Sequence, residues 1–466
     1  MQRTAILNVV GLTSRLIGEH TPAIRAFVER NRSALVEPAV PAVTCTAQAA
    51  YLTGRLPRDH GVVANGWYDR DYAEHRFWKQ PEQLMRGEKL WEALRRVDPQ
   101  FTCAKLFWWF NMHSTADISI TPRPLYPADG RKVFDVHTQP MPLRERIKKD
   151  LGHFPFRHFW GPGSDIQSSI WIANSAKWVE EKHWPGLSLV YLPHLDYNLQ
   201  RVGLDMEKIG ADLRQIDNVV GDLIRFYETR NIKVVLLSEY GITDVDHPVH
   251  LNRVFREKGW LSIKDELGSE TLDLGGSKAF AIADHQVAHV YVNDASILHQ
   301  VRGVLEATPG VGQVLGKMEK HLTGLNHERS GDLIAISDAR SWFTYYYWQD
   351  DKKAPDFARC VDIHRKCGYD PVELFLDPSI KWPKLKIAGK LAQKALGQRM
   401  LMDVIPLDAT LVKGSHGRIP EDRADWPVLI GDFDQLPRTG TLSAHEVCGH
   451  LFRLCARGEG DAGAAT

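Results

Sequence analysis

The first position in this sequence that suggests chemistry is a threonine placed just before a short apolar segment. Thr44 precedes the helix-competent stretch AQAAYL, which ends at Thr53-Gly54. Backbone N–H groups and the dipole at a helix N-terminus attract anions, so a hydroxyl there would face a bound phosphoryl group. On the local sequence alone, a plain N-cap role for Thr44 or Thr46 is the favoured interpretation. A nucleophilic role for the Thr44 hydroxyl is the alternative, and it needs other residues to support it.

Further polar residues follow apolar runs that have the length of strands. The run LVYL is followed by PHLDYNLQ, and KVVLLS is followed by EYGITDVDH. In an open parallel sheet, ligands bind beyond the carboxyl ends of the strands, so we expect these polar residues to converge. In the segment AFAIADHQVAHVYV, we expect Asp284 and His285 to lie in a solvated turn and His289 to face the core.

The segments that must position these residues alternate between strand-like and helix-like patterns. Residues 206–229 place Ile209, Leu213 and Ile216 on one helical face, and residues 12–32 also have helical spacing. The strand-like runs are 5–10, 102–109, 187–192, 233–238, 288–293 and 331–337. This alternation predicts an α/β fold with a mainly parallel, doubly wound sheet and helices on both faces.

The composition is that of an ordinary soluble globular chain, because 43% of the 466 residues are hydrophobic and 25% are charged. We expect a single α/β domain over residues 1–455 and a disordered, small and polar tail over 456–466. Lys+Arg and Asp+Glu both total 58, and without a basic surplus we expect no nucleic acid polymer as partner. No apolar run approaches the ~20 residues of a membrane-spanning helix, so we expect no membrane partner.

The start of the chain and the cysteines indicate the compartment. The residues MQRTAILNVVG are typical of a first core strand and not of a signal peptide. The six cysteines include no CxxC pair, which argues against a disulfide or zinc-ribbon framework. We therefore expect a reduced, cytoplasmic protein.

Two long stretches interrupt the alternation of strands and helices, at residues 110–165 and 342–413. Connections this long in a compact domain are usually lids or binding elements, so we expect insertions that form a lid or a small subdomain. Trp109, Arg123 and Tyr126 lie in or beside the first stretch and are candidates for holding a base or sugar and its phosphate. Simple aromatic packing within a lid explains these residues equally well.

One long motif resembles the nucleophile segment of the alkaline phosphatase superfamily. The motif is P-x-x-T-x8-T-G-x-x-P-x-x-H-G-x3-N, and its fixed positions are Pro41, Thr44, Thr53, Gly54, Pro57, His60, Gly61 and Asn65. The resemblance is to the type I phosphodiesterase/nucleotide pyrophosphatase branch and to phosphonoacetate hydrolase. Later landmarks occur in the family's order at 193–196, 238–241 and 415–417. The resemblance implies an alkaline-phosphatase-like fold.

The resemblance also implies a mechanism and its catalytic residues. In that family two divalent metals, typically zinc, flank a threonine or serine nucleophile, which here would be Thr44. Asn65 would hold a non-bridging phosphoryl oxygen. One metal lowers the pKa of the hydroxyl, and the other stabilises an oxygen on the opposite side of the phosphorus. Water bound at the Asp196/His416 metal would then cleave a phosphothreonine intermediate.

The metal ligands are where this chain departs from the family. The aspartate that ends the family's first strand is replaced by Val10, and Asn8 is the nearest donor on the same strand face. The family's Ser-Asp-His-Gly becomes Ser-Glu-Tyr-Gly at residues 238–241, and its Asp-x-x-x-His becomes Asp196…Gln200. By position, one site would hold Asp196, Gln200 and His416, and the other would hold Thr44, Glu239, Tyr240 and Asn8.

These replacements leave the identity of the cofactor open between zinc and magnesium or manganese. Amide oxygens and phenols bind zinc more weakly than imidazole, and oxygen-rich sites suit Mg²⁺ or Mn²⁺. The altered set could still hold one or two ions, the metals could be lost, or neighbouring side chains could substitute. The candidate substitutes are Asp246, His250, Asp284 and His285.

The sequence therefore predicts a metal-dependent phosphoric ester hydrolase, similar to phosphodiesterases and nucleotide pyrophosphatases, with a small phosphate ester as substrate. The alternative is a non-catalytic relative that binds a phosphate ligand at degenerate metal sites. The substrate, the metal, the pathway and the oligomeric state do not follow from the sequence.

Overall fold

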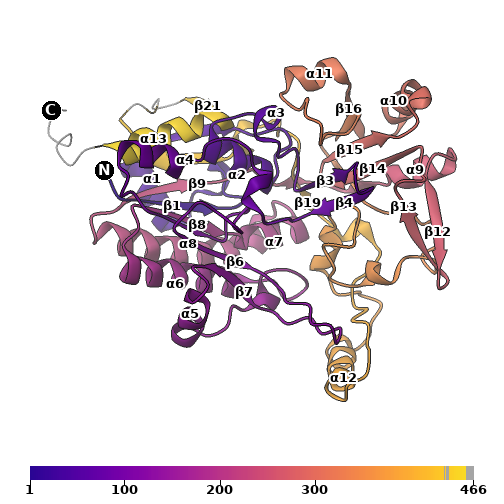
Figure 1. The fold of residues 1–466 in the computed structure, drawn as a ribbon, viewed down its shortest axis with the longest axis horizontal. Coiled ribbons are helices and arrows are strands. Elements are labelled where there is room, and N and C mark those ends of the chain that lie inside the picture. Colours follow the sequence, from indigo (N-terminus) through magenta and orange to yellow (C-terminus); the bar gives the residue numbers. More distant parts are fainter. Residues whose placement is uncertain (435, 437–439, 458–466) are drawn as a thin grey trace.

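The central element of the computed structural model is a large mixed sheet (Figure 1). The model describes residues 1–434, 436 and 440–457. Within them the strand order is β21-β2-β20-β9-β1-β8-β5-β6-β7. The strands are β1 Thr4–Val9, β2 Arg32–Glu37, β5 Cys103–Leu106, β6 Ile118–Pro122, β7 Val136–Gln139, β8 Leu187–Leu192, β9 Lys233–Leu237, β20 Val428–Gly431 and β21 Thr441–Ser443. Because β9, β1, β8, β5 and β6 are parallel neighbours, the predicted α/β class is confirmed.

Helices cover both faces of this sheet (Figure 1). One face packs α1 Pro22–Arg30, α5 Leu143–Leu151, α6 Ile166–His183, α7 His194–Val202 and α8 Met206–Glu228. The other face packs α2 Thr44–Thr53, α4 Leu90–Val97 and α13 Val447–Ala456, with the short α3 Pro57–His60 beside α2. Strands β1 and β8 are buried along their whole length, as expected for parallel strands with helices on both sides.

The long helix α8 shows how the sequence sets an element of this layer. Asp205 caps it by accepting hydrogen bonds from the backbone N–H groups of Glu207 and Lys208. Ile209, Leu213 and the apolar residues that follow at helical spacing are buried, which confirms the predicted helix.

The helix expected over residues 12–32 forms only in part, as α1 Pro22–Arg30. Ser14–Leu16 forms a single 3-10 turn, η1, and the α-helix starts only at Pro22. Proline fits the first turn of a helix but cannot donate the hydrogen bond that a helix interior requires. The segment ends by joining the sheet as β2 from Arg32 onward.

A second group of elements lies at one end of the sheet, on the right in Figure 1. Its largest part is an antiparallel sheet in the order β14-β15-β17-β16. The runs at 288–293 and 331–337 do form strands, but they belong to this sheet and not to the central one. The strands are β14 Ala279–Asp284, β15 Val287–Val292, β16 Val311–Leu315 and β17 Leu333–Ser337.

Short paired strands and helices complete this second group. The strand pairs are β3 Gly66–Asp69 with β4 Glu74–Phe77, β10 Thr243–Asp244 with β19 Gly414–Ser415, β11 His247–Val249 with β18 Ser341–Phe343, and β12 Ser262–Glu266 with β13 Ser269–Asp273. The helices are α9 Leu251–Glu257, α10 Leu298–Ala307, α11 Lys317–Leu322 and α12 Pro383–Ala395. A separate aromatic-rich core, which includes Tyr291, Trp342 and Trp348, holds the group together.

The two insertions and the tail take different places in this fold. Residues 110–165 contribute β6, β7 and α5 to the main body, whereas residues 342–413 carry α12, which projects from the molecule. The helix α13 ends at Ala456, and the predicted tail lies outside the described residues from 458 onward. In the part of the chain that is described, no helix combines the length and apolar character needed to cross a bilayer.

Candidate active site

Thr44 is the first residue of α2 and lies at the edge of the sheet where β8 and β9 end. The N-cap position belongs to Val43, and the Thr44 side chain makes no capping bond, so the simple N-cap interpretation is not what the structure shows. Its Oγ1 lies 3.3 Å from the phenol oxygen of Tyr240, which follows β9. The hydroxyl thus faces side chains from other elements of the sheet.

Tyr240 connects Thr44 to an aspartate. The Tyr240 hydroxyl donates to Oδ1 of Asp196 at 3.1 Å, so it is free to accept the hydrogen bond from Thr44. Burial raises the pKa of Tyr240 well above its usual range, which keeps the phenol neutral. Burial also raises the pKa of Asp196 to about 7. These groups form a hydrogen-bond chain that runs from a hydroxyl to a carboxyl group.

His416 and Gln200 complete the surroundings of Asp196. The imidazole of His416 stacks on the Tyr240 ring at 3.6 Å, and its Nδ1 lies 2.7 Å from the carbonyl oxygen of Ala42. That bond assigns the hydrogen to Nδ1, so the lone pair of Nε2 faces Asp196 Oδ1 at 3.9 Å. Gln200 donates from Nε2 to Asp196 Oδ2 at 2.7 Å. We call Thr44, Asp196, Gln200, Tyr240 and His416 the Thr44 cluster.

The side chain of Glu239 is held differently, by two amides. Nδ2 of Asn8 and Nε2 of Gln48 both donate to its Oε1, at 2.5 and 2.6 Å. Gln48 Oε1 accepts from the backbone N–H of Trp109 at 2.7 Å, which fixes the orientation of this amide. Glu239 is completely buried, and burial raises its pKa to about 8. The glutamate is therefore mainly protonated at neutral pH.

Asn65 lies on the other side of the first turn of α2. Its Oδ1 accepts from the backbone N–H of Cys45 at 3.0 Å. Its backbone N–H and its Nδ2 donate to the two carboxyl oxygens of Asp284, at 2.8 and 3.1 Å. The sequence places Asn65 and Asp284 219 residues apart, and the fold brings them into direct contact.

The turn of Asp284 and His285 is not solvated, contrary to expectation. Both residues are buried, and His285 Nδ1 lies 2.8 Å from Asp284 Oδ1. The His285 ring lies 3.7 Å from that of His416 and 3.6 Å from that of Tyr369. The turn is buried because the second group of elements packs β14 and β15 against the end of the sheet. His289 faces the core as predicted, with Nε2 3.1 Å from the carbonyl oxygen of Val63.

Of the three substrate-binding candidates, two lie apart from this cluster. Trp109 is close to the site through its backbone bond to Gln48, and its ring packs on Trp78 at 4.7 Å. Tyr126 is 61% exposed, and Arg123 donates to the sulfur of Met112. Among the described residues, neither Tyr126 nor Arg123 forms a hydrogen bond or ion pair with the Thr44 cluster.

The two other suggested substitute ligands point elsewhere. Asp246 pairs with Arg340 on the surface, and Nδ1 of His250 lies 2.7 Å from the hydroxyl of Thr344.

Sequence reasoning missed two residues that the site contains, Gln48 and Tyr369. Gln48 follows Thr44 by four residues and thus shares its helical face, a signal that was available, whereas Tyr369 carries none.

These side chains do not fit the two-metal centre that the family resemblance implies. At the position of the first-strand ligand, Val10 offers no donor atom and is completely buried. The amide nitrogens of Asn8 and Gln48 point at Glu239, and the phenol of Tyr240 donates to Asp196. Across residues 1–434, 436 and 440–457, no three His, Cys, Asp or Glu side chains converge closely enough to hold a metal ion.

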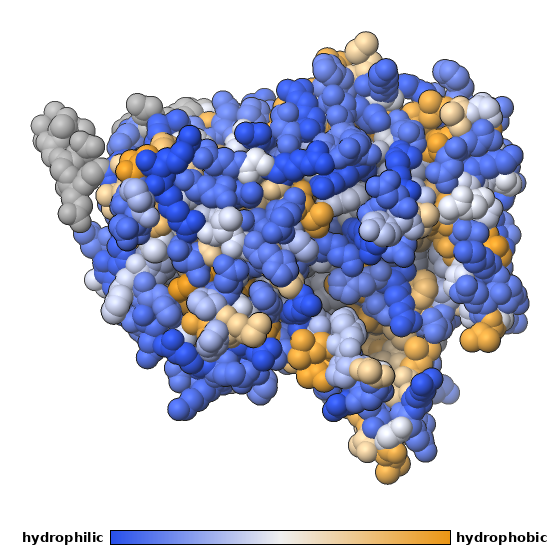
Figure 2. All heavy atoms as spheres, viewed as in Figure 1, coloured by the Kyte–Doolittle hydropathy of each residue, from blue (hydrophilic) through white to orange (hydrophobic). Residues whose placement is uncertain are grey.

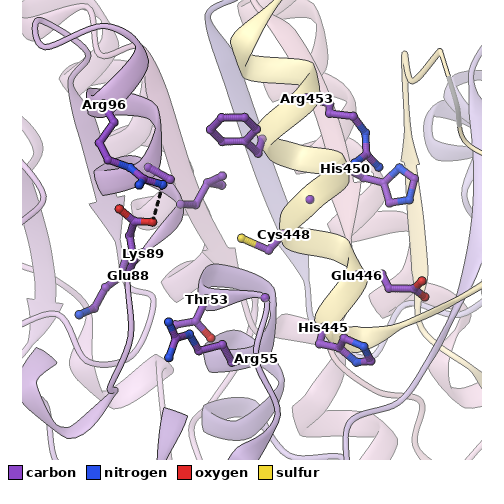
Figure 3. Close-up of a pocket in the computed structure, with 15 residues that line it drawn as sticks. Thr53, Arg55, Glu88, Lys89, Arg96, His445, Glu446, Cys448, His450 and Arg453 are labelled. Carbon is purple, nitrogen blue, oxygen red and sulfur yellow. Dashed lines mark hydrogen bonds and ion pairs between the residues drawn. The ribbon is translucent and has the colours of Figure 1, made fainter. Parts of the chain in front are cut away.

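A cavity of about 580 Å³ lies at the opposite end of α2 (Figure 3). It is bounded by the C-terminal end of α2, by α4 and by α13, with Thr53 and Cys448 in its wall. Several cationic side chains surround it, and Glu88 pairs with Arg96 across one side. Because Thr44 and Thr53 are the two ends of a ten-residue helix, this cavity is distinct from the Thr44 cluster.

Comparison with known proteins gives a family match over most of the chain. Residues 4–370 match the family model of type I phosphodiesterases/nucleotide pyrophosphatases. An uncharacterised pyrophosphatase/phosphodiesterase of Schizosaccharomyces pombe is 24% identical over 261 residues. That match spans 52% of this chain and 46% of the yeast protein, so it covers about half the length of this relative.

Solved structures share the whole fold at low sequence identity. Murine ectonucleotide pyrophosphatase/phosphodiesterase 5, as an inactive variant with AMP, superposes with a TM-score of 0.58 at 13% identity. The match covers 98% of this chain and 95% of the murine chain. Phosphonoacetate hydrolase from Sinorhizobium meliloti 1021, with phosphonoacetate, gives a TM-score of 0.60 at 12% identity, over 97% and 96% of the two chains. These likenesses establish the alkaline-phosphatase-like fold.

Proposed function

Because the chain belongs to the type I phosphodiesterase/nucleotide pyrophosphatase family, we propose that it hydrolyses a small phosphate ester at the Thr44 cluster. The observation that carries this proposal is the hydrogen-bond chain from Thr44 through Tyr240 to Asp196. It starts at the N-terminus of α2, where backbone N–H groups favour a bound phosphoryl group. A nucleophile and a proton acceptor thus lie beside an anion-binding position.

The side chains supply the following chemistry. The oxygen of Thr44 forms a bond to phosphorus while the bond from phosphorus to the leaving oxygen breaks. The Thr44 proton moves to the Tyr240 oxygen as the Tyr240 proton moves to Asp196, and the leaving oxygen takes a proton from solvent. A water molecule then forms a bond to phosphorus as the Thr44–phosphorus bond breaks. Asp196 returns its proton through Tyr240 to the Thr44 oxygen, the attacking water releases a proton to solvent, and phosphate or a phosphate monoester leaves.

Asn65 would bind the phosphoryl group only after a local change. Its amide nitrogen now bonds to Asp284 and its oxygen to the N–H of Cys45. These bonds hold the side chain beside the first turn of α2, next to the position proposed for the phosphoryl oxygens. A nucleotide-type ester is our first substrate candidate, since the structure of murine ectonucleotide pyrophosphatase/phosphodiesterase 5 contains AMP.

A cofactor, if this chain uses one, is not the two-metal centre of the family. Asp196 and His416 keep a carboxylate and an imidazole lone pair on one side, and these two residues would be the protein ligands of a divalent ion. On the Glu239 side two amide nitrogens, which do not ligate metal ions, bind Oε1, and we assign this side no metal. Glu239 Oε2 and Asn8 Oδ1 are buried without a hydrogen-bond partner among the described residues. We therefore propose at most one ion per chain, which elemental analysis of the purified protein measures directly.

Replacing Thr44 by alanine tests the proposal. We expect turnover of p-nitrophenyl phosphate mono- and diesters to fall by about 10³-fold or more, because the attacking oxygen is gone. Thr46→Ala is the matched control, since Thr46 is a buried threonine in the same turn of α2. Both variants should keep the wild-type circular dichroism spectrum. Equal turnover of Thr44→Ala and wild type would sink the mechanism.

The same assay separates the hydrolase from the non-catalytic alternative. The wild-type protein is assayed with added Zn²⁺, Mg²⁺ and Mn²⁺, and its binding of AMP is measured by calorimetry. Binding of AMP without turnover under every metal condition would identify a phosphate-ligand-binding relative and overturn the hydrolase proposal.

A further inference from the structure

The helix α12, Pro383–Ala395, projects from the body of the molecule at the bottom of Figure 1. It belongs to a segment, residues 381–402, that contains basic residues and no acidic residue. The basic residues are Lys381, Lys384, Lys386, Lys390, Lys394 and Arg399. Because the whole chain has equal numbers of acidic and basic residues, this is a local concentration of positive charge.

The same helix exposes large apolar side chains. Trp382, Leu385 and Leu396 are 74%, 71% and 77% exposed, and Leu401 follows at 42%. The first three have helical spacing with the small residues Ala388 and Ala392, so they form one outward stripe. Figure 2 shows hydrophobic and hydrophilic side chains next to one another on this protrusion.

The inward face of α12 is already occupied. Ile387 packs against the aromatic-rich second core. Lys386 and Lys390 bond to the two carboxyl oxygens of Asp403, each at 2.9 Å. These contacts fix the orientation of the helix and leave the stripe of Trp382 and Leu385 pointing away from the protein. The stripe is therefore free to contact another molecule.

The charges beside the stripe define its partner. Lys381, Lys384, Lys394 and Arg399 are exposed and, among the described residues, form no ion pair. A helix with an exposed apolar stripe and lysines beside it matches a surface that is negatively charged outside and apolar beneath. Tryptophan at such a boundary places its ring among lipid headgroups.

We propose that α12 docks the protein on the surface of an anionic lipid bilayer. Trp382, Leu385 and Leu396 insert between the lipids, and Lys381 and Lys384 contact phosphate headgroups. The helix lies in the interface and does not cross the bilayer. This inference departs from the expectation of no membrane partner, which rested on the lack of a spanning segment, and it is independent of the proposed hydrolysis.

Flotation of the full chain with lipid vesicles tests the inference. We expect binding to phosphatidylcholine vesicles that contain phosphatidylglycerol, weaker binding to phosphatidylcholine alone, and release at high salt. Leu385→Glu/Leu396→Glu should weaken binding by about tenfold or more because it removes apolar contact. Lys381→Gln/Lys384→Gln should weaken it by about tenfold because two surface charges are lost.

A matched control lies on another exposed helix. Met318 and Leu322 on α11 are 69% and 78% exposed, so Met318→Glu/Leu322→Glu makes the same change elsewhere. This variant should float like the wild type, and all variants should melt at the wild-type temperature.

Three results would overturn the inference. The first is a wild-type protein that fails to float with anionic vesicles at low salt. The second is equal binding by the wild type and Leu385→Glu/Leu396→Glu. The third is a wild-type dimer, seen by light scattering and abolished in that variant, that does not bind vesicles; the stripe would then be an interface between two copies of the chain.

Discussion

The candidate site contains two buried carboxyl groups, Asp196 and Glu239, whose surroundings differ. We call these surroundings the Asp196 half and the Glu239 half. Asp196 contacts a phenol, an amide and the lone-pair side of an imidazole, and it retains a small exposure of 8%. Glu239 has no exposure, and two amides donate to one of its oxygens. Burying a carboxylate without a counter-charge is costly, and a protein avoids this cost with a cation or by keeping the acid protonated. Amide donors and a retained proton take the place of a cation in the Glu239 half, whereas in the Asp196 half the carboxyl group keeps neighbours suited to chemistry.

The largest change in activity that tests the contrast between Asp196 and Glu239 is expected for a substitution of Tyr240. Tyr240→Phe keeps the ring stacked on His416 but removes the hydroxyl between Thr44 and Asp196. We expect kcat to fall by about 10²-fold with a smaller change in KM, because proton transfer is lost while the shape of the site remains. Steady-state kinetics on p-nitrophenyl esters measures both. Tyr197→Phe, at a buried tyrosine on α7, should leave kcat unchanged. An equal loss in both variants would contradict the role given to Tyr240.

The protonation of Glu239 is tested by the pH dependence of stability. The pKa of Glu239 is about 8 in the folded protein, against 4.5 when unperturbed. As pH rises from 4.5 to 8, the unfolded chain releases this proton while the folded chain keeps it, so the free energy of unfolding falls. The Glu239→Gln variant has no such proton to lose. Its free energy of unfolding should therefore exceed that of the wild type by roughly 2–4 kcal/mol at pH 9 but not at pH 4.5. Urea unfolding at the two pH values measures the difference.

An exposed acid provides the control for that experiment. Asp71→Asn should show no pH-dependent gain relative to the wild type, because Asp71 lies on the surface. A Glu239→Gln variant that is less stable than the wild type at pH 9 would show that Glu239 is an ionised, paired carboxylate.

A smaller effect is expected when one of the two amide donors is removed. Gln48→Ala leaves one donor on Glu239 Oε1 and removes the acceptor for the Trp109 N–H. We expect a loss of roughly 1–3 kcal/mol in the free energy of unfolding, the usual cost of unsatisfied buried polar groups. Gln393→Ala, on the exposed face of α12, should change it by less than about 0.5 kcal/mol. A Gln48→Ala variant as stable as the wild type would mean that the amides do not hold Glu239.

Much of the fold and part of the site could be predicted because the relevant patterns are local. The apolar runs at 5–10, 187–192 and 233–238 form β1, β8 and β9, since parallel strands buried on both faces are apolar throughout. Their carboxyl ends lie at one edge of the sheet, which is why Asp196 and Tyr240 meet, as expected from their positions after two strands.

The burial of the Asp284 turn could not be predicted in the same way. A turn between two strands is solvated unless another layer of the protein covers it. The sequence of the turn does not indicate whether such a layer is present. In this chain β14 and β15 belong to the second, antiparallel sheet, which packs at the end of the central sheet. Asp284 therefore contacts Asn65, and His285 contacts His416. Tyr369 reaches the site from a stretch of the insertion at 342–413 that forms neither helix nor strand.

The sequence by itself determined the α/β class, the threonine at the start of α2, and the absence of a ligand at Val10, because each follows from residue type and short-range spacing. Only the tertiary structure decided what takes the place of that ligand. Asn8 and Glu239 are separated by 231 residues, and their contact depends on the pairing of β1 with β9. Whether a buried carboxyl group has a cation, an amide or a proton as its partner is set by the donors that the fold brings within hydrogen-bond distance, and local sequence does not encode those distances.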